Sequence, residues 1–161
     1  GYAFEGAEAS FYLLAHRLKG GSLPFSVEGF SVFVHGSGLD TAWAEVTVRV
    51  KVGESLQHTA AESPSGPVSA LDRAFRKAVL QFYPELSDVE LTDYKVRILS
   101  GQESGTNSGV RVMIEMKRGE ERFATVGASE NILEASLKAL TDGYAYALLY
   151  PSLKEMVPRA G

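Results

Sequence analysis

The 161-residue sequence has no cysteine, which excludes disulfide bonds, thiolate catalysis and cysteine-ligated zinc or iron–sulfur sites. It also has no apolar run long enough to cross a bilayer, so we expect no membrane span. The net charge of −4 argues against a broad phosphate-binding surface. Together these absences fit a cytoplasmic protein whose length is sufficient for one domain with an ordinary core.

Familiar active-site motifs are absent as well. The chain has no Gly-x-Ser-x-Gly elbow, phosphate loop or dinucleotide glycine pattern, and its histidines stand singly at positions 16, 35 and 58. The polar positions of the strand pattern Glu45–Val52 include no aromatic residue for base stacking. We therefore predict no catalytic residue, no metal site and no nucleic-acid partner for this chain.

An internal repeat is the main feature that the sequence does contain. The apolar pattern of residues 30–82 recurs 64 positions later (94 − 30 = 64), and no gap is needed to follow it. Fewer than half of the matched pairs are identities, so what repeats is the spacing of apolar residues and the position of the turns between them. The matched pairs include Phe30 with Tyr94, Val48 with Val112, Val68 with Ile132 and Phe82 with Tyr146.

Each copy of the repeat reads as three strands followed by a helix. Strict alternation predicts antiparallel strands with one covered face, and the helical spacing that follows predicts a helix packed on that face. We therefore predict an α+β fold of two pseudo-symmetric βββα repeats, at about residues 27–90 and 91–154. Both repeats belong to one predicted domain, residues 23–161.

The residues ahead of the repeats, 1–22, are predicted to be a linker from a preceding domain that this chain does not contain. Its helix, Ala7–Leu18, carries an apolar stripe of Phe11, Leu14 and Leu18, and a Gly-Gly pair ends it. This segment has no second half of its own to pack against, which favours a role as a connector.

The two strand-to-helix junctions are the places where backbone groups could meet a ligand. A helix start presents unpaired N–H groups and the positive end of the helix dipole, which suit a carboxylate. In the first copy, Pro64–Pro67 leads into this start, and Val68 and Ser69 retain their N–H groups. In the second copy, Ser129 is the expected N-cap. Two interpretations remain open: ordinary helix capping, or a cradle for a ligand.

Several runs of the sequence, in order, resemble a single family. Together they resemble the C-terminal regulatory (allosteric, dimerisation) domain of the α-isopropylmalate synthase and citramalate synthase family, and most closely its citramalate branch. The resemblance covers nearly the whole chain. It is carried by His58–Glu62, Ser65–Ala74, Phe82–Leu86, Leu91–Arg97, Thr125–Ile132, Glu134–Ser136 and Ala139-Leu140, and at the start by Gly1–Phe11.

The resemblance implies a function that composition could not show. Parent enzymes of this family condense an α-keto acid with acetyl-CoA in a metal-dependent TIM barrel, which is not in this sequence. Their C-terminal domain forms a homodimer and binds a branched-chain amino acid that inhibits the barrel. We therefore expect no enzyme activity and no cofactor in this chain, with a divalent metal and acetyl-CoA used by the parent. The expected effector is isoleucine, and the alternatives are leucine or a dimerisation module without an effector.

By the same resemblance, the effector pocket uses the first strand-to-helix loop, the strand that opens the second repeat, and the second junction. In this pocket helix-start N–H groups would hold the carboxylate, apolar side chains would surround the aliphatic chain, and Asp93 or loop carbonyls would take the ammonium. Relatives often show Gly-Asn-Gly-Pro where this chain has Pro64–Pro67. The choice between isoleucine and leucine depends on methyl placement, typically worth ~1–3 kcal/mol. The implied residues are Gly66, Val68, Ser69, Leu91, Asp93, Tyr94, Ile98, Asn131 and Ile132.

Overall fold

The computed structural model of the chain describes residues 8–36, 42–99 and 109–156, and of these the side chains of 42 and 151–156 are excepted. The chain divides into two compact units. The first unit is Pro24–Ser87, and the second unit combines Gly1–Leu23 with Asp88–Gly161. Among the described residues, none of the helices is both long enough and apolar enough to span a membrane.

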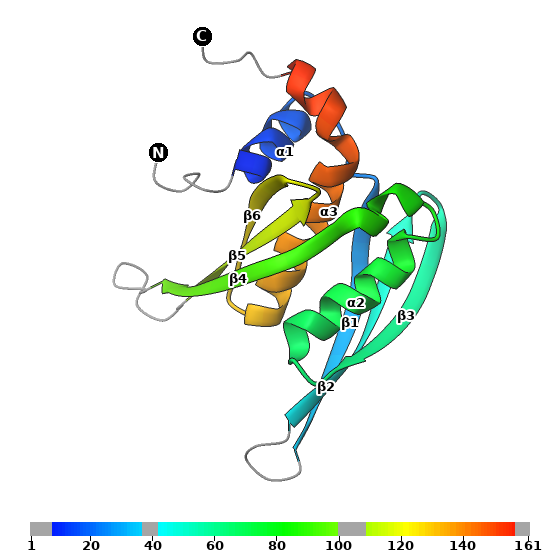
Figure 1. Cartoon of the computed structure of the whole chain (residues 1–161), viewed down its shortest axis with the longest axis vertical. Helices are drawn as coiled ribbons and strands as arrows, with labels where there is room; N and C mark the ends of the chain where they lie inside the picture. Colours follow the sequence, from blue (N-terminus) through cyan, green and yellow to red (C-terminus); the bar gives the residue numbers. More distant parts are fainter. Residues whose placement is uncertain (1–7, 37–41, 100–108, 157–161) are drawn as a thin grey trace. The chain divides into compact units, whose positions relative to one another are not determined.

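The first unit is a three-stranded antiparallel sheet with one helix on one of its faces (Figure 1). Its strands lie in the order β1-β2-β3. The elements are β1 (Phe25–Gly36), β2 (Ala42–Val52), β3 (Ser55–Ser63), α2 (Pro67–Val79) and the short 3-10 helix η2 (Pro84–Asp88). Helix α2 packs on β2 and β3, and reaches β1 only marginally.

The core of the first unit follows from the alternation in β2. Every second residue from Ala44 to Val52 is buried, and the residues between them are polar and mostly exposed. The buried face of α2 meets them with Leu71 and Phe75, and the Phe75 ring lies 5.4 Å from that of Phe25. Each such apolar side chain, fully buried, contributes about 1.5–3 kcal/mol to stability.

The second unit repeats this arrangement and adds a helix from the start of the chain. Its strands lie in the order β4-β5-β6, again antiparallel, and α3 packs on β5 and β6. The elements are α1 (Glu8–Leu18), β4 (Val89–Leu99), β5 (Gly109–Arg118), β6 (Glu121–Ser129) and α3 (Ile132–Met156). The predicted α+β fold of two βββα units preceded by a helix is therefore confirmed.

The shift between the two units is not constant, which corrects the ungapped repeat. The β-bulges of β1 and β4 are 64 positions apart (91 − 27). The hairpin glycines Gly53 and Gly119, with φ of +61° and +59°, are 66 apart (119 − 53). The helices match at 65, since Thr59 donates to Ala74 O and Thr125 to Ala139 O, both at 2.6 Å. An even insertion of two residues between β4 and β5 leaves every side chain on its own face, so the apolar pattern still matched at 64.

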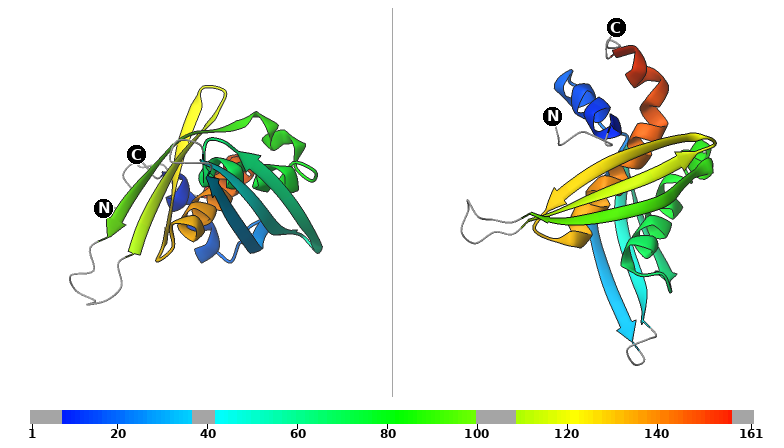
Figure 2. Two further views of the ribbon diagram at one scale, coloured as in Figure 1. Left: turned by 90° about the horizontal axis from the view of Figure 1, so that it is seen from below. Right: turned by 60° about the vertical axis from the view of Figure 1, so that its left-hand side comes forward.

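Helix α1 packs on its own unit through a face that the sequence did not indicate. The predicted stripe of Phe11, Leu14 and Leu18 is 45%, 41% and 79% exposed. The buried residues are instead Ala9 and Leu13. The helix packs on α3 and β6 (Figures 1 and 2). The predicted Gly-Gly terminator is present: Gly20, at φ +85°, donates its N–H to Arg17 O. Whether residues 1–22 also connect to another domain stays a prediction.

Candidate functional site

The nine predicted effector residues fall into two groups. Three belong to the start of α2 in the first unit: Gly66, Val68 and Ser69. The other six belong to the second unit, along β4 and at the start of α3: Leu91, Asp93, Tyr94, Ile98, Asn131 and Ile132.

Helix α2 begins with a glycine that offers no capping side chain. Gly66 is the N-cap, with φ +107° and ψ 179°, a conformation that residues with a side chain rarely adopt. No side-chain hydrogen bond caps this helix start, and Pro67 occupies the first helical position. The N–H groups of Val68 and Ser69 therefore lie at the positive end of the helix without an acceptor from the N-cap.

The end of β3 holds this helix start in place. Ser63 is fully buried, and its hydroxyl oxygen accepts a hydrogen bond from the N–H of Ser65 at 3.1 Å. The same hydroxyl donates to the oxygen of Ser69 at 3.1 Å. Because Ser69 is the acceptor, its own hydroxyl proton is not used in this bond. The buried Ser63 thus fixes the conformation of the loop that leads into α2. Nothing in the sequence pattern indicated this role.

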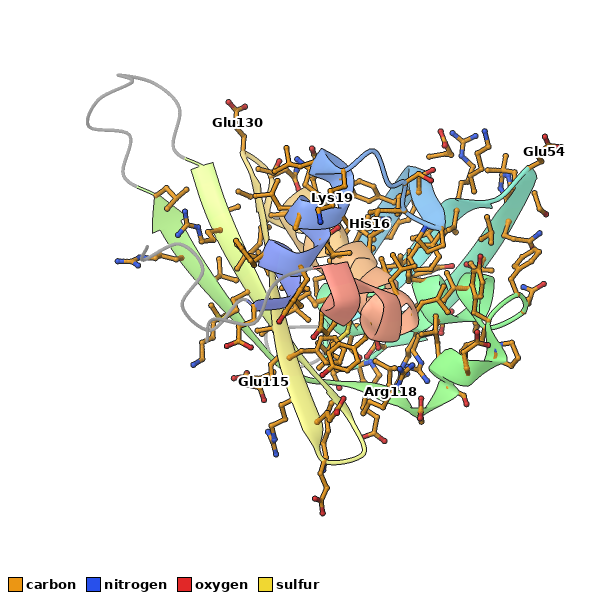
Figure 3. All side chains as sticks on the ribbon, turned by 90° about the horizontal axis from the view of Figure 1, so that it is seen from above. His16, Lys19, Glu54, Glu115, Arg118 and Glu130 are labelled. Atoms are coloured by element: carbon orange, nitrogen blue, oxygen red, sulfur yellow. The ribbon has the colours of Figure 1, made fainter. Side chains whose placement is uncertain are left out.

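Helix α3 begins differently, and its N-cap corrects the prediction of Ser129. The side-chain oxygen of Asn131 accepts hydrogen bonds from the N–H groups of Leu133 at 2.8 Å and Glu134 at 3.2 Å. Ser129 instead accepts from the N–H of Asn131 at 3.2 Å. This helix start is capped by its own side chain, which leaves fewer donors for an external carboxylate. The side chain of Glu130 extends outward into solvent (Figure 3).

Three of the predicted residues share one face of β4. A bulge between Leu91 and Asp93 places Leu91 opposite Met116, and Tyr94 opposite Ile114. Met116 and Ile114 are fully buried, so Leu91 and Tyr94 lie on the core face of the sheet although they are three positions apart. Ile98, further along, shares this face.

This face of β4 is apolar but only partly covered. Helix α3 packs on β5 and β6 and touches β4 marginally. As a result Tyr94 is 46% exposed and Ile98 75% exposed, while the residues opposite them on β5 lie deeper in the sheet. We call Leu91, Tyr94, Val96 and Ile98 the β4 stripe. Large apolar side chains left exposed in a row indicate a binding surface.

Asp93 does not join the β4 stripe. The register pairs it with Glu115, on the opposite face of the sheet. There Glu115 forms an ion pair with Arg122 at 3.0 Å and accepts a hydrogen bond from the Thr92 hydroxyl (Figure 3 labels Glu115). The same bulge that brings Leu91 and Tyr94 together therefore turns Asp93 away from them.

The first unit carries a matching apolar row that the sequence analysis did not treat as functional. Phe30, Val32 and Val34 pair with Val48, Val46 and Ala44, so they lie on the face of the sheet that α2 covers elsewhere. Phe30 is 38% exposed and Val34 62% exposed. We call these three residues the β1 stripe. The 64-residue offset, which relates them to Tyr94, Val96 and Ile98, was the available signal.

His35 lies on the opposite face of β1. Its ring stacks on Trp43 with centroids 4.4 Å apart, and its Nε2 lies 3.4 Å from a Glu45 carboxylate oxygen. Among residues 8–36, 43–99 and 109–150, whose side chains the structure describes, no group of three or more His, Asp or Glu side chains is placed to hold a metal ion.

Known proteins resemble this chain over most of its length. A family model described as the LeuA allosteric (dimerisation) domain matches residues 5–148. The chain is 52% identical over 151 residues to the (R)-citramalate synthase of Geobacter sulfurreducens and 46% identical over 155 to that of Synechocystis sp.. Both alignments cover 92% of this chain and 28% of the relative, so the chain spans under a third of their length. A 2-isopropylmalate synthase of Salinibacter ruber is 30% identical over 125 residues, which is 78% of this chain and 20% of that protein.

Proposed function

Because the chain belongs to the LeuA allosteric (dimerisation) domain family, we propose that it dimerises and binds an effector on behalf of a larger citramalate synthase-like enzyme. In this proposal the chemistry takes place in a TIM barrel of the same parent protein, in the cytoplasm. A divalent metal and acetyl-CoA serve that barrel, and the present chain contributes no catalytic group. The proposed role of the chain is to change the activity of that barrel.

The observation that carries the proposal is the pair of half-covered sheets. In each unit the helix leaves most of one outer strand, β1 or β4, uncovered on the face of the sheet that is buried elsewhere, and both strands place apolar side chains there. Ile98 at 75% and Val34 at 62% exposure are costly to leave in water. A second copy of the chain that covers these stripes would complete both cores, which supports a homodimer.

Each of the two groups of predicted effector residues, taken within its own unit, suits one part of a branched-chain amino acid. The N–H groups of Val68 and Ser69 suit its carboxylate, because Gly66 supplies no competing cap. The apolar β4 stripe, above all Tyr94 and Ile98, suits its aliphatic side chain. Asp93 lies on the other face of β4 from the stripe, so loop carbonyls are the proposed partners of the ammonium group.

Isoleucine is the proposed effector, and leucine is the alternative. The relatives of 43–52% identity are named citramalate synthases, whereas the 2-isopropylmalate synthase is 30% identical. Calorimetric titration of the chain with isoleucine, leucine and valine, beside a light-scattering mass, tests this choice. We expect a dimer that prefers isoleucine. A preference for leucine would assign the chain to the other branch, and a dimer that binds none of the three would favour a dimerisation module alone.

A matched pair of variants tests the pocket itself. Ile98→Ala removes an exposed member of the β4 stripe, and we expect effector affinity to fall about tenfold, because roughly 1–3 kcal/mol of apolar contact is lost. Val34→Ala alters the corresponding position of the first unit (98 − 34 = 64) and should lower affinity clearly less, because Val34 belongs to the proposed dimer surface and not to the pocket. Equal effects of the two variants on affinity would contradict the assignment of the pocket to β4.

Regulation in this proposal is a linkage between binding and dimer arrangement. An effector shifts an equilibrium only by its difference in affinity between two states. The isoleucine-bound dimer must therefore differ from the free dimer in a way that the barrel can sense. The exposed residues of α1 are the proposed point of transmission.

A further inference from the structure

The free edge of β3 and the adjacent side of α2 form a groove in the first unit. Its volume is about 390 Å³, and no residue described for this unit fills it. The groove is strongly basic, since three of its six lining residues are cationic. The lining residues are Ala61, Glu62, Arg73, Arg76, Lys77 and Leu80.

The second unit has the same groove, and there α1 fills it. Ser10 of α1 accepts a hydrogen bond from the N–H of Val126 on the free edge of β6, at 2.9 Å. Arg17 of α1 donates to a carboxylate oxygen of Asp142 on α3, at 3.0 Å. Ala9 and Leu13 are completely buried in this position. A helix seated between an edge strand and its covering helix is thus a stable arrangement of this fold.

The strand offset of 66 and the helix offset of 65 match the two grooves residue by residue. Val126 corresponds to Ala60 (126 − 66), and Asp142 corresponds to Lys77 (142 − 65). A shared side-chain contact supports the match. Arg73 donates to Glu62 O at 3.0 Å, and Lys138 of the second unit donates to Ala128 O at 3.2 Å, at the same two offsets.

The groove of the first unit has the opposite charge at the position of Asp142. The carboxylate of Asp142, which receives Arg17 in the filled groove, is replaced by the ammonium of Lys77. That ammonium donates to Ala60 O at 2.6 Å, so it lies directly on the strand edge. In a β-strand the N–H and C=O of one residue point to the same side, so the N–H of Ala60 faces the groove as well. An occupant must therefore supply a hydrogen-bond acceptor and a negative charge.

We propose that this groove is the docking site of an acidic amphipathic helix, which takes the place that α1 takes in the second unit. A hydrogen-bond acceptor on that helix takes the N–H of Ala60, as Ser10 takes that of Val126, and a carboxylate on the same helix, at the position of Arg17, pairs with Lys77. A β-strand is a poorer occupant, because Arg73 and Lys77 already cover the edge carbonyls that it would need. The inference is independent of the proposed effector site.

The probe is a synthetic peptide of the α1 sequence, residues 8–18, that carries Arg17→Glu. It is capped at both ends and cross-linked on its exposed face, because an 11-residue helix is marginal in water. Amide chemical shifts of the 161-residue chain are followed during titration. We expect shifts confined to Ala60–Glu62 and Arg73–Lys77. The unmodified Arg17 peptide should bind at least about tenfold more weakly, since a close charge pair is reversed.

A charge swap supplies the control. In the Lys77→Glu chain the order of affinities should reverse, with the Arg17 peptide now the tighter ligand, while distant amide shifts stay unchanged and show that the fold is intact. Equal affinity of the two peptides, absence of binding, or shifts centred on Val126 and Asp142 would overturn the proposal. Inorganic phosphate is titrated in the same way. If phosphate produces the same shifts and competes with the peptide, and Lys77→Glu does not reverse the order of the two peptides, the groove is a small-anion site and the helix proposal is overturned.

Discussion

The two units protect the free edges of their sheets by partly different means. In both units the helix that covers the sheet reaches the edge, since Arg73 binds Glu62 O and Lys138 binds Ala128 O, and the first unit adds Lys77 at Ala60 O. In the second unit a separate helix, α1, lies along the edge and binds Val126. Open strand edges pair with other chains unless they are blocked. The same fold therefore carries an additional helix along the edge of β6 and none along the edge of β3 in the part of the chain that the structure describes. The edge of β3 is where a further helix can be added.

The largest expected effect comes from removing the anchor of α1. Leu13→Ala leaves a cavity at a fully buried position and should lower the free energy of unfolding of the second unit by about 3 kcal/mol. Leu14→Ala, one position on but 41% exposed, should change it by less than about 0.5 kcal/mol. Denaturant unfolding measures both, and hydrogen exchange at Val126 reports whether the edge has opened. Similar losses in the two variants would contradict the assigned face of α1.

The next effect comes from the closest contact between a helix and a strand. A Cβ built on Gly127 would lie 2.1 Å from Ala135 O and 2.8 Å from Ala139 N, which are backbone atoms of α3. Gly127→Ala must therefore push α3 away from β6, at a cost of about 2–3 kcal/mol.

The first unit offers the control for this change. The corresponding residue, at offset 66, is Ala61, which is buried and already has a Cβ. Ala61→Gly should cost only about 1 kcal/mol, through the flexibility of the unfolded chain and a small void. Thermal melting compares the two variants. A smaller loss from Gly127→Ala than from Ala61→Gly would show that the units pack their helices at the same distance.

A smaller effect distinguishes the two helix starts. Asn131→Ala removes an acceptor for two N–H groups of α3 and should cost about 1 kcal/mol. Gly66→Asn offers the first unit a cap but forces a side chain into a φ of +107°. We expect it to weaken isoleucine binding more than it changes stability, as read by calorimetry and melting together. Unchanged binding would remove the helix start of α2 from the proposed site.

The smallest effect is a pH dependence that arises at Asp142 in the second unit. Burial raises the pKa of Asp142 above its ordinary value of 3.8, and the Arg17 guanidinium opposes this rise. Because the folded state holds this proton more tightly, the contribution to stability is complete below about pH 3.8 and is lost as the pH rises through the folded pKa.

Arg17→Gln raises the pKa of Asp142 further, so this loss should become larger and extend to higher pH. At neutral pH we expect it to cost about 1 kcal/mol or less, because Arg17 is partly exposed. Urea unfolding at a series of pH values measures the slope, and Asp142→Asn should remove it. Parallel pH profiles for the unchanged chain and Arg17→Gln would contradict a coupling between the two groups.

Local patterns were sufficient to predict the repeated part of the fold. Alternation in β2 and helical spacing in α2 depend on neighbours within one element, and these are visible in the sequence. The even insertion between β4 and β5 did not disturb the pattern, which is why the fold was found although the offset was not constant. An odd insertion would have reversed the faces of two strands.

Features set by distant partners could not be predicted. Two apolar faces compete on α1, and the buried one is selected by β6 and α3, more than 100 residues away (Ser10 and Val126 are 116 apart). The face of Asp93 depends on a bulge at Thr92 that leaves no clear mark in the sequence. In the candidate site, the Gly66 turn was foreseeable from its Pro and Gly residues, whereas the buried Ser63 beneath it was not.

The position of α1 also has a consequence for the order in which the molecule assembles during synthesis. The first unit is continuous in sequence and is complete once Ser87 has left the ribosome. The second unit is discontinuous: its first helix, α1, precedes the first unit in the sequence, and the helix that receives it, α3, follows that unit. Ala9 and Leu13 therefore stay unburied until the whole first unit and α3 have been synthesised. Because domains tend to fold as they emerge, the inserted unit folds first, and α1 and α3 pack on the second sheet afterwards.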